Sequence, residues 1–374
     1  MRLTDLETPA LILDGAKLDR NIGRMRTQLG GLGVRQRPHL KTAKSIEVAR
    51  RVAPDGGPIT VSTLLETEKF GAAGFRDILY AVGIAPNKLD RVVALRRQGI
   101  DLSIVTDNVD AAGAVAVAAR EAGERIPVLI EIDSDGHRAG VRPDQPELLV
   151  AIARALSDGA EVRGIMTHAG GSYGARTGAE LVRAAAQERD SAVVCAETLR
   201  GAGFPAPVVS IGSTPTALSA TDLDGVTEVR AGVYLFFDLV MHGIGVAGLD
   251  EIALSVLTTV IGHQRDKGWI LVDAGWMAMS RDRGTANQAV DQGYGLVCDV
   301  DGNPFADLIM VSANQEHGIL AIRDGSSTPL PDLPFGTRLR ILANHACATA
   351  AQFGEYQVVE EGEVVARWPR FNGW

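Results

Sequence analysis

Short apolar runs alternate with helix-forming segments through the first two thirds of the chain, and this alternation constrains the fold most. An apolar run at residues 10–13 precedes a helical pattern at 16–29, and a run at 77–82 precedes one at 85–98. Further strand-like runs lie at residues 102–105, 128–132, 162–167, 208–211 and 228–233. Such alternation is typical of βα units. With the segments around His39 and Ile59 the runs number about eight, which is the number of strands that closes a parallel barrel.

The pattern changes after about residue 249. Residues 253–261 and 269–273 are strand-like, and turn signals recur at 301–304, 324–326 and 361–362. This pattern of strand-like runs separated by turns predicts an antiparallel β domain. We therefore expect a TIM-like (β/α)8 barrel over residues 8–245, followed by a β domain that residues 246–374 form together with residues 1–7.

The composition is that of a globular protein and argues against several function classes. Apolar residues make up 46% of the 374 residues, and the net charge of -9 argues against a nucleic-acid partner. No apolar stretch approaches the roughly eighteen residues of a membrane span, and the first residues do not resemble a signal peptide. The three cysteines do not describe a disulfide framework. We expect a cytoplasmic protein with a small-molecule partner.

Lys41 is the candidate nucleophile. It lies in the segment Arg37-Pro38-His39-Leu40-Lys41-Thr42-Ala43-Lys44, where an early barrel strand should end. The ends of the strands build the active site in such barrels. A lysine that is partly desolvated there, near other cations, can form an imine with an aldehyde. A lysine on a solvated basic loop is the competing interpretation.

A second candidate site follows the apolar run at residues 207–209. Gly212, Ser213 and Thr214 combine a glycine with two hydroxyls and backbone N–H groups. Such a combination can cradle a phosphate without a lysine or a metal ion. The same residues would also serve as an ordinary βα turn in which a hydroxyl caps the next helix.

His345 and Cys347 are candidate metal ligands near the end of the β domain. On a strand, residues two apart project to one side, so the imidazole and the thiolate can hold one cation such as Zn²⁺. Two protein ligands leave coordination positions open, which suits a catalytic ion. The competing interpretation is a buried cysteine beside a hydrogen-bonded histidine. His317 is a candidate third ligand or a structural hydrogen-bonding residue.

Three further predicted strand ends place polar side chains beside glycines. They are His137 and Arg138 within residues 135–140, His168 and Tyr173 within 167–173, and Arg230 and Tyr234 within 230–234. Glycines at these points allow a ligand to approach the backbone, although each could equally form a tight turn.

Together these motifs resemble the D-serine dehydratase and D-threonine aldolase family of alanine-racemase-like pyridoxal-phosphate (PLP) enzymes. The resemblance extends from about Thr8 to Trp374. It rests on the order and spacing of residues 38–42, 135–140, 210–218, 230–234, 273–286, 315–318 and 344–349. The resemblance implies an (β/α)8 barrel of the alanine racemase N-terminal type with a C-terminal antiparallel β domain.

The resemblance also implies roles for individual residues. Lys41 is the implied Schiff-base lysine and the base at Cα, and His345 with Cys347 would bind a divalent ion (Zn, Mn or Mg). The other implied cofactor-binding residues are Arg138, Tyr173, Gly212, Ser213, Thr214 and Tyr234. A His-x-Cys pair at the metal position is typical of the family's dehydratases and His-x-Asp of its aldolases, so this chain resembles the dehydratases. By analogy, the chain forms a homodimer.

The expected reaction is the elimination of water from a β-hydroxy D-amino acid. It would give oxaloacetate and ammonia from D-threo-3-hydroxyaspartate, or pyruvate and ammonia from D-serine. The alternative is an aldolase that releases glycine and an aldehyde, with His168 as a conceivable base. A racemase and a non-catalytic PLP carrier fit the metal pair less well. A β-carboxylate on the substrate would need a cation, for which Arg281, Arg283 and His242 are unranked candidates.

Overall fold

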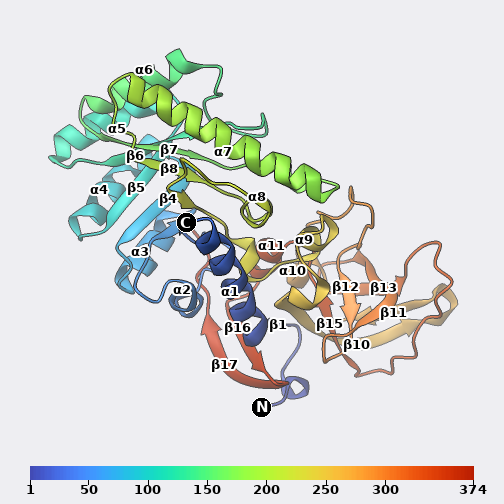
Figure 1. Ribbon diagram of the computed structural model, residues 1–374. Coiled ribbons are helices and arrows are strands. Elements are labelled where there is room, and N and C mark those ends of the chain that lie inside the picture. Colours follow the sequence, from blue (N-terminus) through green and yellow to red (C-terminus); the bar gives the residue numbers. More distant parts are fainter. The chain divides into compact units, whose positions relative to one another are not determined.

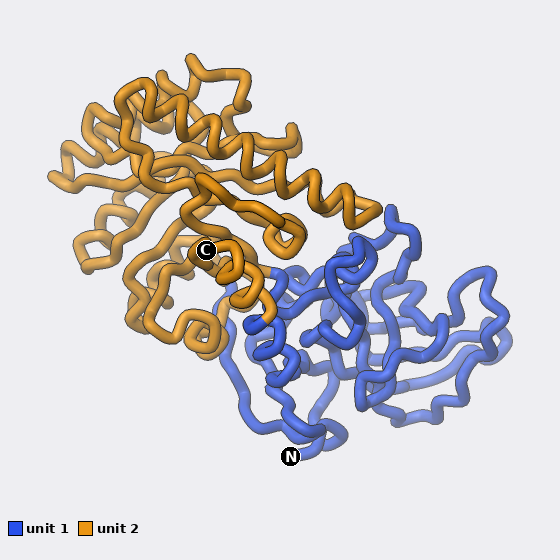
Figure 2. Tube along the Cα trace, viewed as in Figure 1, with its two compact units in different colours: residues 1–23, 233–372 blue, residues 24–232, 373–374 orange.

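The computed structural model describes residues 1–374, which form two compact units (Figure 2). Unit 1 consists of residues 1–23 and 233–372, and unit 2 of residues 24–232 and 373–374. These limits differ from the expected division into 8–245 and 246–374 with 1–7, chiefly because the first strand belongs to unit 1. Helix α1 (Gly15–Gly31) runs from one unit into the other.

Unit 2 is a closed barrel of eight parallel strands (Figure 1). The strands are β2 (Arg35–Gln36), β3 (Ile59–Val61), β4 (Asp77–Gly83), β5 (Asp101–Thr106), β6 (Pro127–Ile132), β7 (Glu161–Thr167), β8 (Val208–Ile211) and β9 (Glu228–Val229). They pair in the order β2-β9-β8-β7-β6-β5-β4-β3. A parallel bridge between His39 and Thr60 joins the continuation of β2 to β3 and closes the barrel. The fold class predicted from the βα rhythm is confirmed.

Seven helices follow α1 in unit 2, and four of them begin at a hydroxyl or amide cap. The seven helices are α2 (Ile46–Val52), α3 (Leu64–Ala72), α4 (Leu89–Arg97), α5 (Val109–Ala122), α6 (Pro146–Ser157), α7 (Gly178–Gly201) and α8 (Thr214–Ser219). Thr63, Asn108 and Thr177 accept hydrogen bonds from the first turns of α3, α5 and α7. Each such cap stabilises its helix by about 1 kcal/mol. Short 3-10 turns occupy Pro86–Lys88 and Gly170–Gly174.

Unit 1 contains an antiparallel barrel of six strands. The strands of its sheet are β1 (Ala10–Asp14), β10 (Leu254–Gln264), β11 (Trp269–Val272), β12 (Leu296–Cys298), β13 (Pro304–Ala313), β14 (Gly318–Ile322), β15 (Arg338–Leu342), β16 (Glu355–Glu360) and β17 (Glu363–Pro369). They pair in the order β11-β14-β13-β12-β15-β10-β1-β16-β17, and an additional β10–β11 pairing closes the ring of β10 to β15. Short helices α9 (Leu239–Gly243), α10 (Trp276–Met279) and α11 (Ala346–Ala350) accompany it, with 3-10 turns at Leu3–Asp5, Val233–Leu235, Leu249–Glu251 and Arg265–Lys267.

Strand β1 corrects the prediction that residues 10–13 open the barrel. It pairs antiparallel with β10 and parallel with β16. Ile12 packs into a cluster with Leu3, Leu6, Leu257 and Val359. A short apolar run that is buried on both faces has the same pattern in a parallel barrel and in a central antiparallel position, so periodicity cannot separate the two.

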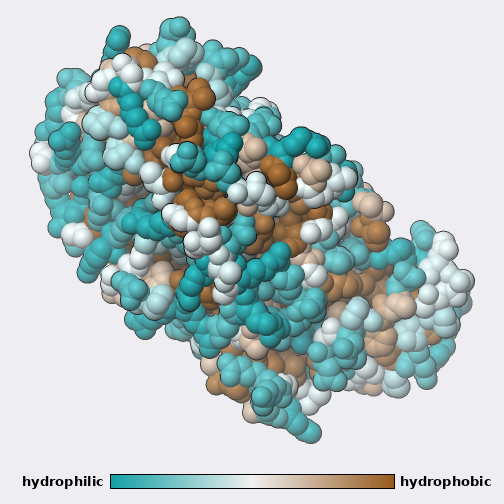
Figure 3. All heavy atoms as spheres, viewed as in Figure 1, coloured by the Kyte–Doolittle hydropathy of each residue, from teal (hydrophilic) through white to brown (hydrophobic).

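The surface drawn in Figure 3 is mainly hydrophilic, with smaller hydrophobic areas between the polar ones. The most exposed large apolar side chains are Phe335 and Trp374. None of the helices combines the length and the apolar character that crossing a membrane requires.

Candidate active site

Lys41 lies just beyond the carboxyl end of β2, on a segment whose backbone is fixed from both sides. The N–H of His39 donates to the carbonyl of Ala231 at 2.8 Å, and that of Leu40 donates to the carbonyl of Thr60 at 2.9 Å. Gly232 permits this approach, because a Cβ there would lie 2.6 Å from the carbonyl oxygen of His39. The neighbouring strands β9 and β3 therefore fix the backbone that leads into Lys41.

The Lys41 side chain is exposed and its ammonium group has no hydrogen-bond or ion-pair partner. The sequence had suggested partial desolvation, which the structure does not show. Lys44, the other lysine of the segment, is half-buried and lies 3.4 Å from the buried carboxylate of Glu66. Of the two amines, that of Lys41 is therefore the one available for chemistry.

Two histidines beside Lys41 are held neutral. His168 follows the end of β7, and its Nδ1 lies 3.0 Å from the carbonyl oxygen of Gly212. Burial, reinforced by the charges of Lys41 and Arg230, lowers the pKa of His168 to about 3. Burial and the same two cations also place the pKa of His39 well below its usual value. Because Nδ1 of His168 donates to Gly212, its Nε2 carries no hydrogen and can accept one.

This neutral state predicts how the stability of the protein depends on pH. The ordinary pKa of 6.5 is the unfolded value for His168, so below that pH the unfolded chain binds a proton that the folded chain does not. Stability is therefore complete above pH 6.5 and is lost as the pH falls towards 3. Between pH 7 and pH 5 the loss due to His168 is about 2 kcal/mol. His168→Asn should reduce that loss in urea unfolding, and equal losses in both proteins would contradict the prediction. The exposed His317→Gln is the control.

A polar network inside the barrel positions the buried Arg230. The Nε of Arg230 donates to Ser210 Oγ at 2.8 Å, and Ser210 Oγ in turn donates to Glu228 at 2.8 Å. Glu228 also accepts from Nε of Arg37 at 2.8 Å, and Arg230 additionally donates to the carbonyl of Thr167. Charges are buried here in a hydrogen-bonded chain, which gives Arg230 one defined position.

The turn of residues 212–216, here called the phosphate turn, begins α8. Ser213 caps the helix, and its Oγ lies 3.1 Å from Ser172 Oγ and 2.9 Å from Thr216 Oγ1. The N–H of Gly212, which we had expected at a phosphate, donates instead to Glu188 at 3.0 Å. Gly212 has a φ of +138° and a Cβ there would lie 2.1 Å from the carbonyl oxygen of Arg230, so glycine is needed for the shape of the turn.

The remaining predicted cofactor residues lie in different surroundings. Arg138 is largely exposed and pairs with the buried Glu131 at 3.3 Å. The Tyr173 ring is centred 6.2 Å from that of His168. Tyr234 is fully buried in the 3-10 turn Val233–Leu235 of unit 1. The barrel unit thus brings together Lys41, His168 and Tyr173.

His345 and Cys347 adjoin each other, but not on a strand as predicted. Strand β15 ends at Leu342, His345 is the extended residue that precedes α11, and Cys347 lies in the first turn of that helix. His345 Nδ1 lies 2.9 Å from Asp282 Oδ2. Burial lowers the pKa of His345, but hydrogen bonds with Asp282 and Cys347 outweigh it and raise the pKa to about 11. The pair is therefore brought together by a strand-to-helix junction rather than by strand alternation.

The donor set of this pair fits a divalent ion. Cys347 is partly accessible, whereas Cys195 and Cys298 are buried and burial raises the pKa of each thiol to about 11. With Nδ1 of His345 bound to Asp282, Nε2 is left to face a metal, which is the common carboxylate–histidine–metal arrangement. No group of three or more His, Cys, Asp or Glu side chains is arranged so that it could hold a metal ion, and His317 lies exposed between β13 and β14. Two protein ligands leave the other positions for water and substrate.

Buried hydrogen bonds support the backbone beside the candidate metal ligands His345 and Cys347, here called the metal pair. Asp238, which is 2% exposed, accepts from the N–H of Ala346 at 2.9 Å. Asn344 donates to the carbonyls of Asp282 and Gly293 at 3.1 and 2.8 Å. Sequence reasoning missed Asp238, Asp282 and Glu188. Each is distant in sequence from the group it supports, and no motif spacing could have indicated it.

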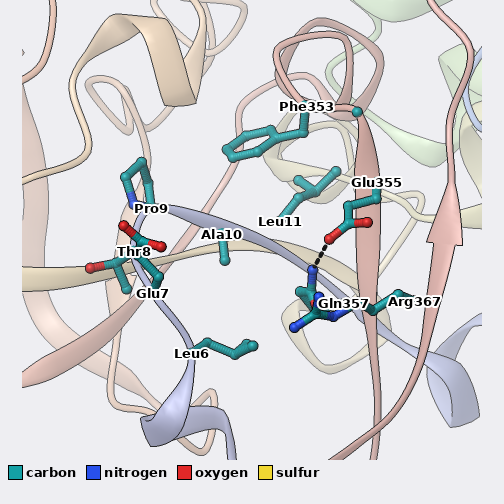
Figure 4. A pocket seen from close by; sticks show the side chains of 11 residues that line it. Leu6, Glu7, Thr8, Pro9, Ala10, Leu11, Phe353, Glu355, Gln357 and Arg367 are labelled. Carbon is teal, nitrogen blue, oxygen red and sulfur yellow. Dashed lines mark hydrogen bonds between the residues drawn. The ribbon is translucent and has the colours of Figure 1, made fainter.

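A separate hollow of about 490 Å³ lies on unit 1 beside β1 and β16 (Figure 4). It is lined by Leu6, Glu7, Thr8, Pro9, Ala10, Leu11, Phe353, Gly354, Glu355, Gln357 and Arg367. In Figure 4, Glu355 points towards Gln357, whose Nε2 donates to it at 2.7 Å. None of the predicted site residues lines this hollow.

The comparisons with known proteins agree with this fold. Residues 13–240 match the model of the alanine racemase N-terminal domain, and residues 253–359 match a serine dehydratase domain model. The chain belongs to the alanine-racemase-like family that combines these two domains. It is 56% identical to the D-threo-3-hydroxyaspartate dehydratase of Delftia sp. strain HT23, over 100% of this chain and 99% of that protein. The resemblance inferred from the motifs is thereby confirmed.

Other relatives and solved structures extend the comparison. The chain is 30% identical to the D-serine dehydratase of Dictyostelium discoideum, over 96% of this chain and 94% of the relative. It is 28% identical to a 3-hydroxy-D-aspartate aldolase of Paracoccus denitrificans, over 98% and 92%. The structure of the Delftia dehydratase covers 100% of both chains with a TM-score of 0.97 and 55% identity. A mutant of a D-threo-3-hydroxyaspartate dehydratase, with the same TM-score and coverage and 54% identity, is described in a metal-free form.

Proposed function

We propose that the chain is a lyase that uses PLP and a divalent metal ion to eliminate water from β-hydroxy D-amino acids. D-threo-3-hydroxyaspartate would give oxaloacetate and ammonia, and D-serine would give pyruvate and ammonia. The observation that carries the proposal is the His345–Cys347 pair with Asp282 on the far nitrogen of the imidazole. Racemisation has no leaving group for such an ion to act on, whereas a Lewis acid assists the loss of a hydroxyl from Cβ.

The barrel residues fit a phosphate-bearing aldehyde cofactor. The Lys41 amine has no partner and lies beside neutral histidines, so it can attach covalently to an aldehyde carbon. Ser213 and Thr214 contribute hydroxyl groups at the phosphate turn, and Gly212 shapes that turn. When bound, PLP accepts the electron pair that remains on Cα after its proton leaves. We assign the removal of that proton to the Lys41 amine.

The metal pair would act on the hydroxyl group of the substrate. A divalent ion supplies Lewis acidity to the departing oxygen. His345 and Cys347 would hold the ion, and Asp282 would keep the imidazole oriented with Nε2 towards it. The released enamine tautomerises to an imine, and water hydrolyses it to the 2-oxo acid and ammonia.

Arg281 is the best of the three candidate cations for a β-carboxylate on the substrate. Arg283 already pairs with Asp291 at 2.7 Å, and His242 Nδ1 lies 3.0 Å from the carbonyl oxygen of Ala247. Arg281 lies over the Trp276 ring at 5.0 Å and has no carboxylate partner. It directly precedes Asp282, which contacts His345. We therefore assign selectivity for 3-hydroxyaspartate over serine to Arg281.

Comparing substrates tests the proposed reaction. The holoenzyme is incubated separately with D-threo-3-hydroxyaspartate, D-serine and D-threonine, and ammonia, 2-oxo acid and glycine are assayed. We expect ammonia and 2-oxo acid, with D-threo-3-hydroxyaspartate turned over fastest. An aldolase would instead release glycine, with the neutral His168 as the base for the β-hydroxyl. Glycine without ammonia rules out the dehydratase.

Substituting Asp282 with Asn should weaken metal binding while leaving the fold intact. Asn retains an acceptor for His345 Nδ1 but not the charge that makes the imidazole a better ligand. We expect the zinc dissociation constant to rise roughly 10- to 100-fold, measured by competition with a chromophoric chelator. Asp301→Asn, in the exposed turn between β12 and β13, is the control. Unchanged zinc affinity in Asp282→Asn would show that Asp282 does not support metal binding.

The assembly and location of the protein complete the proposal. We propose a homodimer in the cytoplasm, by analogy with the family and from the sequence features described first. Light scattering should give twice the mass of one chain. The mass of a single chain would contradict the dimer.

A further inference from the structure

Glu188 is a fully buried carboxylate that no step of the proposed reaction uses. It projects from α7 to the carboxyl ends of two barrel strands. Its Oε1 accepts hydrogen bonds from the N–H groups of Ala169 and Gly212, at 2.9 and 3.0 Å. Its Oε2 accepts from Thr216 Oγ1 at 2.6 Å, a distance typical of a charge-assisted bond. Glu188 therefore links the end of β7, the turn after β8 and helix α8.

Burying a charged carboxylate costs free energy. The groups around Glu188 show which form of the side chain the site suits. All three direct partners of Glu188 are donors, and the buried cation Arg230 lies close enough to oppose the rise in its pKa that burial causes. An ionised carboxylate accepts hydrogen bonds and donates none, so it suits three donors. A neutral amide of the same shape would turn its NH₂ towards at least one of them. The site is thus matched to the charge of Glu188 as well as to its shape.

Glu188 also determines which hydroxyl groups of the phosphate turn donate hydrogen bonds and which accept them. Thr216 gives its only hydroxyl hydrogen to Glu188, and Ser172 gives its own to the carbonyl of Ala169 at 2.7 Å. Neither can then donate to Ser213, whose Oγ lies within 3.1 Å of both. Thr216 Oγ1 instead accepts from the N–H of Ser213 at 3.1 Å. Ser213 is consequently the one hydroxyl of the three whose hydrogen is not committed to a carboxylate or a carbonyl.

We propose that Glu188 is a positioning residue for the phosphate turn, which fixes both the backbone of residues 212–216 and the hydrogen directions within it. This inference rests on the proposed function, because it assumes that the turn binds the cofactor phosphate. Glu188 acts through Gly212, Ser213 and Thr216, and no hydrogen bond or ion pair joins it to Lys41. Glu188 therefore affects the affinity for the cofactor only through binding of the phosphate group.

The test compares PLP with pyridoxal, which lacks the phosphate, in Glu188→Gln and in the unmodified protein. Affinities are measured by titrating the cofactor-free proteins and following the absorbance of the bound aldehyde. We expect Glu188→Gln to bind PLP about tenfold more weakly and pyridoxal with unchanged affinity. A changed phosphorus NMR signal of bound PLP should accompany the loss. Glu197→Gln, on the exposed side of α7, should change neither affinity.

The outcomes separate this inference from the proposed function. If PLP and pyridoxal affinities fall equally, or neither falls, Glu188 does not act through the phosphate turn and the inference is overturned. If the unmodified protein does not bind PLP at Lys41, the proposed function itself fails. Should Glu188→Gln not fold, Glu188→Asp decides the matter, since it keeps the charge but shortens the side chain whose oxygens reach Gly212 and Thr216. A PLP-specific loss in that variant supports the inference, and an unchanged ratio contradicts it.

Discussion

Replacing Lys41 with Ala should abolish both the covalent attachment of PLP and the elimination reaction. Lys41 is the amine of its segment that has no partner, and it is assigned two tasks, anchoring the cofactor and removing the Cα proton. Proton transfer by a positioned base contributes about 10²- to 10⁴-fold, so turnover should fall by at least about 10³-fold once both tasks are lost. Absorbance of the bound cofactor and ammonia release measure the two effects separately.

Lys44→Arg is the matched control for that experiment. Lys44 is three residues away and already pairs with Glu66 at 3.4 Å, and arginine preserves the charge that this pair needs. Cofactor absorbance should persist in Lys44→Arg and disappear in Lys41→Ala. The reverse pattern would show that the cofactor attaches to Lys44 instead of Lys41.

Removing the metal should abolish elimination without releasing the cofactor. Hydroxide is a poor leaving group, and a Lewis acid at the departing oxygen supplies several kcal/mol. We expect a loss of about 10³-fold in turnover after chelation, with activity restored by Zn²⁺. Cys347→Ala should lose activity and zinc binding together, while the cofactor absorbance persists because Lys41 is unchanged.

Cys298→Ala is the matched control for the thiol. Cys298 is buried and its pKa is raised by burial, so its sulfur is a neutral packing group. Zinc binding should survive in this variant. Full activity of metal-free protein, verified by elemental analysis, would remove the Lewis-acid role from His345 and Cys347.

The barrel was predictable because its signal is local and repeated. Each run such as 128–132 or 162–167 is mainly apolar, and each precedes a segment of good helix formers. The run at 10–13 has the same local signal but lies in the antiparallel sheet of unit 1. Its place depends on which distant strands it meets, and a pattern within one segment contains no information on that.

The candidate site was predictable only where function requires a particular residue type. Lys41, His168, His345 and Cys347 have side chains with distinctive chemistry, so their motifs could be identified. The reason given for His345 and Cys347 was wrong, because Cys347 lies in the first turn of a helix and the pair does not alternate along a strand. Gly212 shapes its turn, while its N–H is bound to Glu188. Supporting carboxylates such as Asp282 and Glu188 are common residues whose roles depend on three-dimensional contacts.

The fate of the Cα–Cβ bond in D-threo-3-hydroxyaspartate separates elimination of water from retro-aldol cleavage. The holoenzyme is supplied with this substrate, with and without prior chelation, and oxaloacetate, ammonia and glycine are quantified together. We expect oxaloacetate and ammonia in equal amounts, no glycine, and loss of both products on chelation that Zn²⁺ reverses. Glycine and glyoxylate in equal amounts would contradict it, because the bond that breaks would then be Cα–Cβ rather than the bond to the hydroxyl.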